Sequence, residues 1–191
     1  INIDLMKRVD VRKWEVLKTM IKAKINAPLT SSMGRLFDAV SSLLSLRDEV
    51  HYEGQAAIEL EMIADQRVTE RYSFKLLNAE VPIMIDTTEI VKGVVQDLTG
   101  EISRSIISGK FHRTIASLII ETCCAIRLKE GLNRVILSGG VFQNILLLSL
   151  VKKGLEHYGF EVYTHHLVPT NDGGISLGQT VIGHMRLFQC A

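Results

Sequence analysis

The chain has 191 residues, of which 47% are hydrophobic and 23% charged, and its formal net charge is +1. This length can bury the core of one sizeable domain or of two small lobes. The balanced charge, without a long run of one sign, argues against a nucleic acid or an anionic membrane as partner. No apolar run is long enough to span a membrane, and Ile1 to Asp4 does not begin a signal peptide. We therefore expect a cytoplasmic protein.

Helical periodicity dominates the first part of the chain. Apolar residues recur at helical spacing on one side of residues 11–25. This side includes Trp14, which we expect to lie in the core. Alternating patterns at 72–76 and 83–85 predict two short strands that pair as a hairpin at a sheet edge. Further helices are predicted at 33–46, 54–63, 88–98 and 102–129.

One candidate binding position lies in the helix predicted at 33–46. Asp38 comes four residues after Gly34, so one helical turn brings the two residues onto a common face. A small residue beside a carboxylate would let a ribose approach. A solvated aspartate near a helix start is the simpler interpretation of these residues alone.

The most informative stretch is a strand that ends at paired glycines. Val135 to Leu137 has the pattern of a buried strand, and Gly139 and Gly140 follow it. An amphipathic helix at 145–158 and a second strand at 160–163 complete a parallel β-α-β crossover. The expected ligand, most simply a phosphate, lies beyond the carboxyl end of the first strand. An ordinary tight turn explains the same glycines, since their spacing matches neither the dinucleotide fingerprint nor the P-loop.

The last stretch holds candidate metal ligands. His165 and His166 are adjacent, and neighbouring side chains of a strand point to opposite faces, so one metal site would rarely use both. Asp172 lies on a glycine-rich turn before the helix predicted at 175–188. It can cap that helix or bind a hard cation, and capping is the default because no second acidic cluster is near in sequence.

Three stretches together resemble a known family in their order and spacing. They are TSSMGRLFDAV at 30–40, YEGQAAIELE at 52–61, and residues 137–144 with 169–178. They resemble the C-terminal part of the hydrogenase maturation carbamoyltransferase (HypF) family, which is similar to the tRNA threonylcarbamoyl-transferring enzymes. The resemblance covers nearly the whole chain.

The resemblance implies an α/β fold, mostly helical with a sheet that contains parallel strands. The fold would be part of an actin- and sugar-kinase-like, two-lobed nucleotide-binding domain. Residues 1–30 are then expected to be a lead-in helical segment, and 31–191 the nucleotide-binding C-terminal lobe. The missing initiator methionine suggests a piece of a longer protein. From the resemblance, we expect the upstream lobe and the N-terminal domains of the family to be absent.

The resemblance also implies roles for individual residues. An adenylate would lie with its ribose and base near Asp38 and Gly54 and its phosphate at Gly139 and Gly140. Asn144 would contact the adenylate as well. Asp172 matches a ligand of a divalent metal, Fe or Zn, whose other ligands, including a pair of histidines, are expected upstream of this chain.

Two positions depart from the family pattern. Ile145 stands where the family often has a basic residue, and Ser45 stands where a glycine is common. Neither departure changes the expected fold. Both leave open whether this particular chain is fully active.

The chemistry implied by the resemblance is carbamoyl transfer. Carbamoyladenylate, made from carbamoyl phosphate and ATP, would give its carbamoyl group to the C-terminal cysteine of a HypE-type partner, for the cyanide ligand of [NiFe]-hydrogenase. Backbone N–H groups of Gly139 and Gly140 would hold the leaving phosphate, and a metal on Asp172 would neutralise charge there. We assign no side chain as general base.

Two other functions stay open. One is a truncated lobe that binds a nucleotide or the partner without turnover, and this is how we expect the piece to behave alone. The other is a phosphotransferase of the sugar- or acetate-kinase type. An apolar face left uncovered by the missing lobe would also favour self-association.

Overall fold

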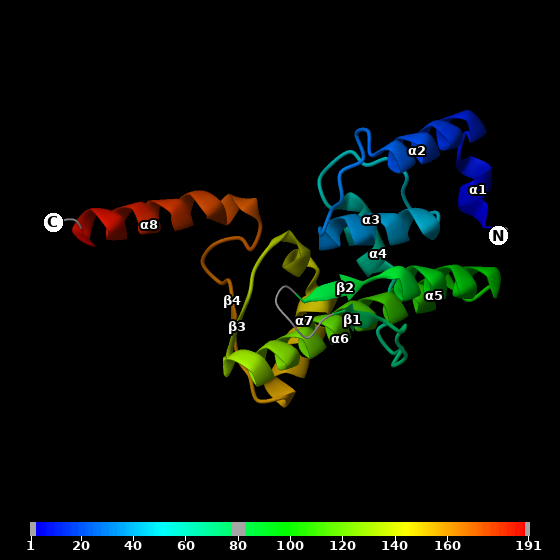
Figure 1. Cartoon of the computed structure of the whole chain (residues 1–191). Coiled ribbons are helices and arrows are strands. Elements are labelled where there is room, and N and C mark those ends of the chain that lie inside the picture. Colours follow the sequence, from blue (N-terminus) through cyan, green and yellow to red (C-terminus); the bar gives the residue numbers. More distant parts are fainter. Residues whose placement is uncertain (1–2, 78–82, 190–191) are drawn as a thin grey trace. The chain divides into compact units, whose positions relative to one another are not determined.

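The computed structural model describes residues 3–77 and 83–189. The chain divides into two compact units, Ile1–Thr114 and Ile115–Ala191 (Figure 1). Among the described residues, no helix is both long enough and apolar enough to cross a membrane. The two units are taken in turn.

Helices make up most of the first unit, as predicted. The predicted hairpin is confirmed, with its first strand at 75–77 instead of 72–76 and its second at 84–86 instead of 83–85, and Lys75 lies opposite Asp86 in antiparallel register. Its connection, at 78–82, lies outside the described residues. The elements are α1 (Asp4–Arg8), α2 (Val11–Ala23), α3 (Met33–Leu43), α4 (Gln55–Met62), β1 (Lys75–Leu77), β2 (Met84–Asp86), α5 (Thr88–Thr99) and the first half of α6 (Arg104–Glu130).

The core of the first unit forms around α3, which packs against α4 and α5. The Phe37 ring meets the Phe111 ring of α6 edge to face, with 4.9 Å between the ring centroids. His112, on the same helix, is fully buried and also lies edge to face with Phe37. The apolar periodicity of α3 and the start of α6 therefore predicts real core positions. The other buried residues include Val40, Leu44, Leu60, Ile90, Val94 and Ile107.

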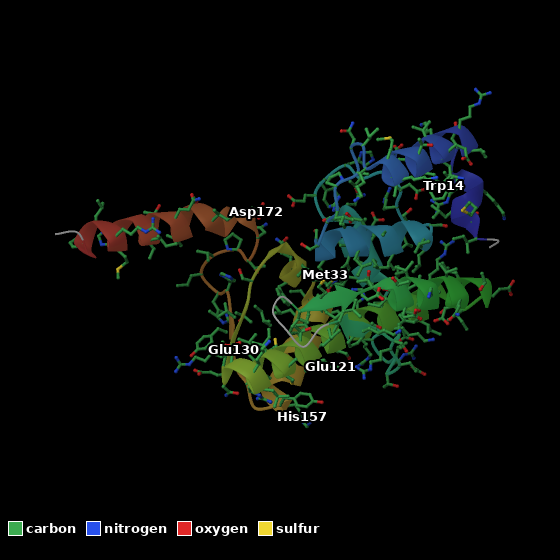
Figure 2. All side chains as sticks on the ribbon, in the orientation of Figure 1. Trp14, Met33, Glu121, Glu130, His157 and Asp172 are labelled. Atoms are coloured by element: carbon green, nitrogen blue, oxygen red, sulfur yellow. The ribbon has the colours of Figure 1, made fainter. Side chains whose placement is uncertain are left out.

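The prediction that Trp14 lies in the core is wrong. Its side chain is 39% exposed, and α2 has no buried residue (Figure 2). Val11, Leu17 and Ile21 share the helical spacing of Trp14 and are exposed too. An amphipathic pattern shows that a helix has an apolar face, but it does not say whether this chain supplies the surface that covers it.

The second unit contains the crossover predicted from the glycine turn. Strands β3 (Arg134–Leu137) and β4 (Glu161–Thr164) are parallel, and Leu137 pairs with Thr164 at the end of the register. Helix α7 (Ile145–His157) connects them and packs on β4. A side-chain carbon at Gly154 of α7 would overlap Ile120 of α6, so the two helices approach closely there. The α/β fold, mostly helical with a parallel strand pair, is confirmed.

Two short 3-10 helices and a long α-helix complete the second unit. They are η1 (Gly140–Gln143), η2 (Asp172–Gly174) and α8 (Ile175–Gln189). The side chains described on α8 are all exposed, among them Val181, Leu187 and Phe188. Like α2, α8 therefore carries apolar side chains that remain open to solvent.

Candidate functional site

The glycine turn and the loop after β4 are joined at the carboxyl ends of the two parallel strands. Gly139 has a φ of 105°, a conformation that favours glycine. Its N–H donates to the Thr170 carbonyl at 2.8 Å, and the Thr170 hydroxyl donates to the Gly139 carbonyl at 3.1 Å. The structure thus brings together two segments that lie some thirty residues apart in the chain, at the sheet edge where ligands of open α/β folds bind.

These bonds change the role expected for the first glycine. The Gly139 N–H already has an acceptor inside the protein, so a phosphate would reach it only by displacing Thr170. The Gly140 N–H, at the start of η1, has no acceptor in the described part of the chain. Of the two backbone groups proposed from the sequence, the one at Gly140 is therefore the one open to a ligand.

Asn144 has a structural role that the sequence interpretation missed. It is 7% exposed, and its Oδ1 accepts a hydrogen bond from the Leu147 N–H at 2.7 Å, which caps α7. An asparagine directly before an apolar helical run is a capping signal that could have been recognised. Contact between Asn144 and an adenylate stays a prediction.

The default interpretation of Asp172 as a helix cap is wrong. The capping side chain is that of Asn171, and it caps η2, which precedes α8: its Oδ1 accepts from the Gly173 N–H at 3.1 Å, and its carbonyl accepts from the Gly174 N–H at 3.0 Å. Asp172 is exposed at the start of η2 (Figure 2), and its carboxylate has no hydrogen-bond or ion-pair partner among residues 3–77 and 83–189. The carboxylate is therefore free to meet a ligand.

The two adjacent histidines do not share a site with Asp172. His165 Nε2 lies 2.9 Å from the Ser138 hydroxyl, and His166 Nε2 lies 3.2 Å from the Thr164 hydroxyl. No group of three or more histidine, cysteine, aspartate or glutamate side chains within the described residues is placed to hold a metal. Asp172 suits a hard cation by its chemistry, but it is one donor where a site needs several.

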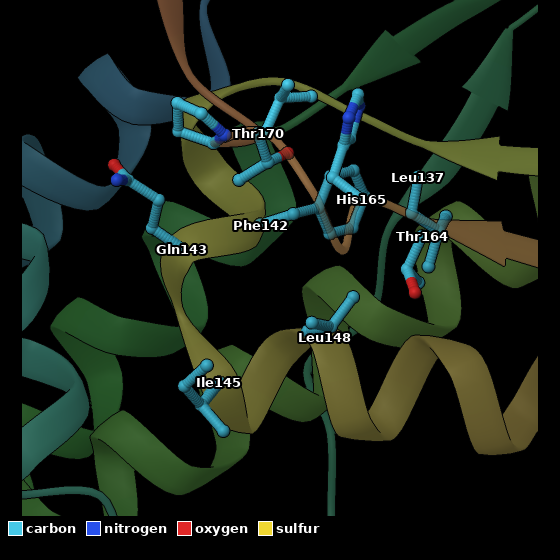
Figure 3. Close-up of a pocket in the computed structure, with 10 residues that line it drawn as sticks. Leu137, Phe142, Gln143, Ile145, Leu148, Thr164, His165 and Thr170 are labelled. Carbon is cyan, nitrogen blue, oxygen red and sulfur yellow. The ribbon is translucent and has the colours of Figure 1, made fainter. Parts of the chain in front are cut away.

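A pocket of about 400 Å³ adjoins the turn (Figure 3). Most of its lining is apolar, with polar groups at Gln143, Thr164, His165 and Thr170. In Figure 3 these residues come from the strand ends, from η1 and from the loop after β4, with Leu148 on α7 below them. Of these four polar residues, only His165 was singled out from the sequence. Which residues meet at the ends of the strands can be known only once the pairing of the strands is known.

The remaining predicted residues, Asp38 and Gly54, belong to the first unit. Asp38 is half-buried on α3 and forms an ion pair with Arg35, with Nη2 and Oδ2 2.7 Å apart. Gly54 precedes α4 with a φ of 79°, so a side chain there would be strained. Asp38 thus lies on α3 and Gly54 directly before α4, and these two helices pack against each other. Their contact with a nucleotide stays a prediction.

An ion pair holds the loop before Gly54. The Arg47 Nε lies 2.8 and 2.7 Å from the two carboxylate oxygens of Glu59, and Gln55 donates to the same carboxylate at 3.0 Å. The Arg47 bond, and then the Gln55 bond, hold the pKa of Glu59 below its usual value. Gln55 Oε1 also accepts from the His51 N–H at 2.8 Å. Gln55 of the YEGQ motif therefore helps to hold the loop that leads into α4.

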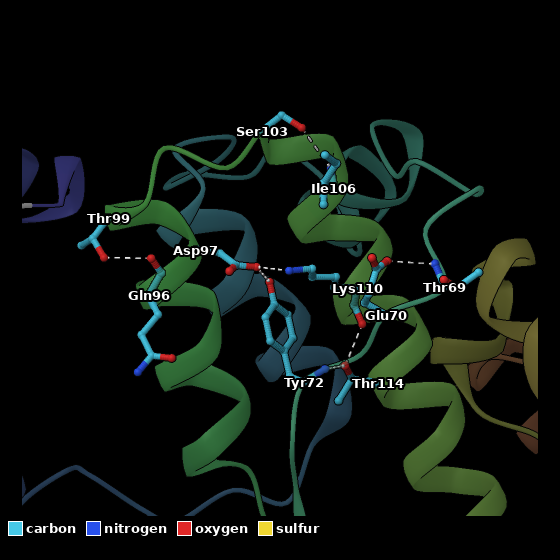
Figure 4. Close-up of polar contacts among 10 residues, drawn as sticks. All are labelled: Thr69, Glu70, Tyr72, Gln96, Asp97, Thr99, Ser103, Ile106, Lys110 and Thr114. Carbon is cyan, nitrogen blue, oxygen red and sulfur yellow. Dashed lines mark hydrogen bonds and ion pairs between the residues drawn. The ribbon is translucent and has the colours of Figure 1, made fainter.

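A second polar cluster of the first unit was not found from the sequence (Figure 4). Asp97 accepts hydrogen bonds from the Tyr72 hydroxyl and the Lys110 ammonium, each at 2.9 Å. The Tyr72 N–H donates to the Thr114 hydroxyl at 2.9 Å. Burial, and then the bond to Asp97, raise the pKa of Tyr72 far above its ordinary range. These bonds tie the segment before β1 to α5 and α6, so we interpret the cluster as structural.

Comparison with known proteins places this geometry in a family. Residues 2–179 match the family model described as the second subdomain of the carbamoyltransferase Kae1-like domain. Carbamoyltransferase HypF of Synechocystis sp. is 39% identical over 80% of this chain and 19% of its own length.

Two solved structures that this chain resembles are also of HypF proteins. One is described as full-length HypF in the phosphate- and nucleotide-bound form, with a TM-score of 0.91 and 42% identity over 96% of this chain and 24% of that one. HypF of T. kodakarensis gives a TM-score of 0.74 and 27% identity over 93% of this chain and 23% of that one. The chain spans about a fifth to a quarter of the length of these relatives. On this basis, the chain belongs to the HypF carbamoyltransferase family and corresponds to the second subdomain of its Kae1-like domain.

Proposed function

We propose that this chain holds the adenylate of carbamoyladenylate while the carbamoyl group passes to the C-terminal cysteine of a HypE-type partner. In the whole protein, ATP and carbamoyl phosphate would supply the carbamoyladenylate, and the product would become the cyanide ligand of [NiFe]-hydrogenase. The observation that carries the proposal is the glycine turn, which is locked to the loop after β4 and still offers the Gly140 N–H. Family membership favours this function over a kinase-type phosphotransferase.

The transfer step balances without a proton donor in this chain. The partner thiolate attacks the carbamoyl carbon and forms a C–S bond, and the bond between that carbon and the phosphate oxygen breaks. The electron pair stays on the phosphate, and AMP leaves. The Gly140 N–H, at the start of η1, would stabilise the charge that develops there. The chain's own contribution is thus to position the leaving group and to receive its charge.

A divalent metal, Fe or Zn, fits this proposal only in part. Asp172 can supply one carboxylate oxygen from an exposed position, where it has no hydrogen-bond or ion-pair partner in the described part of the chain. The rest of the donor set would have to come from outside the described residues. When bound, the ion would neutralise negative charge near the leaving phosphate. A single carboxylate should bind such an ion weakly.

Calorimetric titration of AMP into the chain tests the nucleotide site. We expect binding that weakens in Asp38→Ala and in Asn144→Ser. Serine is chosen at 144 because its hydroxyl can still cap α7 while the amide is lost. Glu130→Ala is the matched control, since it removes an exposed charge from the end of α6 and should leave binding unchanged.

The titration also separates this proposal from an inert lobe. Binding of AMP that ignores both substitutions would place the nucleotide elsewhere and contradict the proposed residues. No binding by a chain that circular dichroism shows to be folded would contradict nucleotide binding by this subdomain alone. Adding Zn²⁺ to the wild type and to Asp172→Asn then tests the metal contact, which we expect to be weak in the first and lost in the second.

A further inference from the structure

Ser138 and His165 are the residues directly after the last register pair of β3 and β4. Leu137 pairs with Thr164, so the next residue of each strand stands at the same level of the sheet edge. Their side chains meet there, with His165 Nε2 2.9 Å from the Ser138 Oγ. His165 also lines the pocket beside the turn (Figure 3).

The glycine turn is therefore held at two consecutive residues. Ser138 is held by the imidazole, and Gly139 is held by the two hydrogen bonds to Thr170. The next residue, Gly140, carries the N–H that is open to a ligand. A hydroxyl and a backbone N–H, both donors, thus stand two residues apart on one fixed turn.

We propose that Ser138 donates a hydrogen bond to the phosphate at this turn, and that His165 is the positioning residue that aims the Ser138 hydroxyl. This inference rests on the proposed function. With the proton of a neutral imidazole on Nε2, His165 donates to the Ser138 oxygen and leaves the hydroxyl hydrogen for an anionic acceptor. A hydrogen bond to a charged oxygen is about twice as strong as a neutral one, so a phosphate suits this arrangement.

Other uses of this imidazole are less well supported. A metal site would need further ligands. The nearest candidate in sequence is His166, and its imidazole forms a hydrogen bond with the Thr164 hydroxyl instead. His165 and Asp172 belong to no group of three potential ligands among the described residues. The hydrogen bond between His165 and Ser138 is the contact on which the proposal depends.

The test compares three ligands, AMP, inorganic phosphate and adenosine, by calorimetry on the chain and its variants. Ser138→Ala should weaken binding of AMP and of phosphate about tenfold, the size expected for one hydrogen bond to a charged group. His165→Ala should weaken both by a smaller factor, and the double variant should bind no worse than Ser138→Ala. His165→Gln should restore most of the affinity, because its amide can donate to the same hydroxyl.

The adenosine arm distinguishes positioning from general support of the fold. Adenosine has no phosphate, so its binding should be equal in wild type and variants, and an equal loss for AMP and adenosine would overturn the inference. Wild-type affinity for AMP in His165→Ala would overturn it as well, while leaving the proposed function in place. If the folded wild type binds neither AMP nor phosphate, the proposed nucleotide site fails, and the inference fails with it.

Discussion

The interior of the first unit and the carboxyl edge of the second unit use their polar groups in opposite ways. Inside the first unit, Ser108 donates to the Leu60 carbonyl at 2.6 Å, and the His112 Nδ1 lies 2.8 Å from the Ser108 carbonyl, with both side chains fully buried. At the edge of the second unit, the Asp172 carboxylate and the Gly140 N–H face solvent without a partner in the described residues. The first arrangement supports the fold, and the second is open to a ligand.

The two regions also differ in what a small change should do. A change in the interior alters the free energy of unfolding, because buried polar groups such as the Ser108 hydroxyl and the His112 imidazole are held by specific neighbours. A change at the edge should leave that free energy nearly unaltered and act on ligand binding. Three measurements test this contrast.

The largest expected effect is a loss of stability in mild acid, caused by His112. Burial lowers the pKa of His112 from 6.5 to about 4, against a smaller opposing effect of its bond to Ser108. The unfolded chain therefore binds a proton that the folded chain does not, between pH 6.5 and about 4. The contribution of neutral His112 to the free energy of unfolding is complete above pH 6.5, and the free energy of unfolding falls by about 3 kcal/mol as the pH drops to 4. Urea unfolding at several pH values measures this slope.

His112→Gln is the control for this prediction, since glutamine does not titrate. The variant will be less stable at neutral pH, but its free energy of unfolding should change much less across the same range. Asp65, whose pKa Arg67 lowers from 3.8 to about 2, contributes its pH dependence below this range. A slope that persists in His112→Gln would assign the acid sensitivity to another group.

The next effect concerns two glycines, one in each region. A Cβ at Gly109 of α6 would overlap the Asp65 carbonyl, which is backbone and cannot rotate away, and it would press on Val68 as well. We expect Gly109→Ala to destabilise the chain by about 2 kcal/mol in spite of the better helix propensity of alanine. A Cβ at Gly140 would meet only the Asn171 Cβ, at 4.0 Å.

Gly140→Ala should therefore change stability by less than about 0.5 kcal/mol and weaken AMP binding instead. Thermal unfolding and calorimetry on both variants give the comparison directly. Equal destabilisation by the two substitutions would show that the turn is as tightly packed as the core and would remove the contrast.

The sequence predicts elements better than it predicts their surroundings. The helices and the β-α-β crossover follow from local periodicity and from Gly139 and Gly140, which is why they are confirmed. Trp14 was placed in the core because its helix is amphipathic, but the covering surface is not a local property. At Gly109 the Asp65 carbonyl approaches α6 closely, and no local sequence pattern encodes this contact.

The candidate site shows the same limit. Gly139 and Asp172 were predicted because a glycine turn and an aspartate on a loop carry a signal of their own, and their contact with a ligand stays a prediction. Thr170 and Ser138 were missed, since their importance comes from the pairing of β3 with β4 and from bonds across the sheet edge. Asn144 was predicted to contact a ligand, and its capping bond to Leu147 was missed, although an asparagine directly before an apolar helical run is a local capping signal.

The smallest effect compares one helix end from each unit. At both ends the chain makes the same pair of backbone hydrogen bonds, each from an N–H after the helix to a carbonyl in its last turn. After α3, Ser45 donates to Ser42 and Leu46 donates to Ser41. After α7, Gly159 donates to Glu156 and Phe160 donates to Leu155. This motif needs a left-handed residue, which is Ser45 (φ 56°) in one case and Gly159 (φ 79°) in the other.

The serine at position 45 therefore carries a cost in backbone conformation that a glycine there would not have. We expect Ser45→Gly to stabilise the chain by about 0.5 kcal/mol, because relief of the left-handed strain exceeds the loss of the exposed 3.0 Å bond from Ser45 to Asp4. Gly159→Ala should destabilise the chain by about 1 kcal/mol, because an alanine would be strained in the left-handed conformation of this position. Both are measured by urea unfolding at neutral pH, where His112 does not titrate. If Ser45→Gly is destabilising, the bond to Asp4 outweighs the strain, and α1 is then a stronger support of the end of α3 than its exposure suggests.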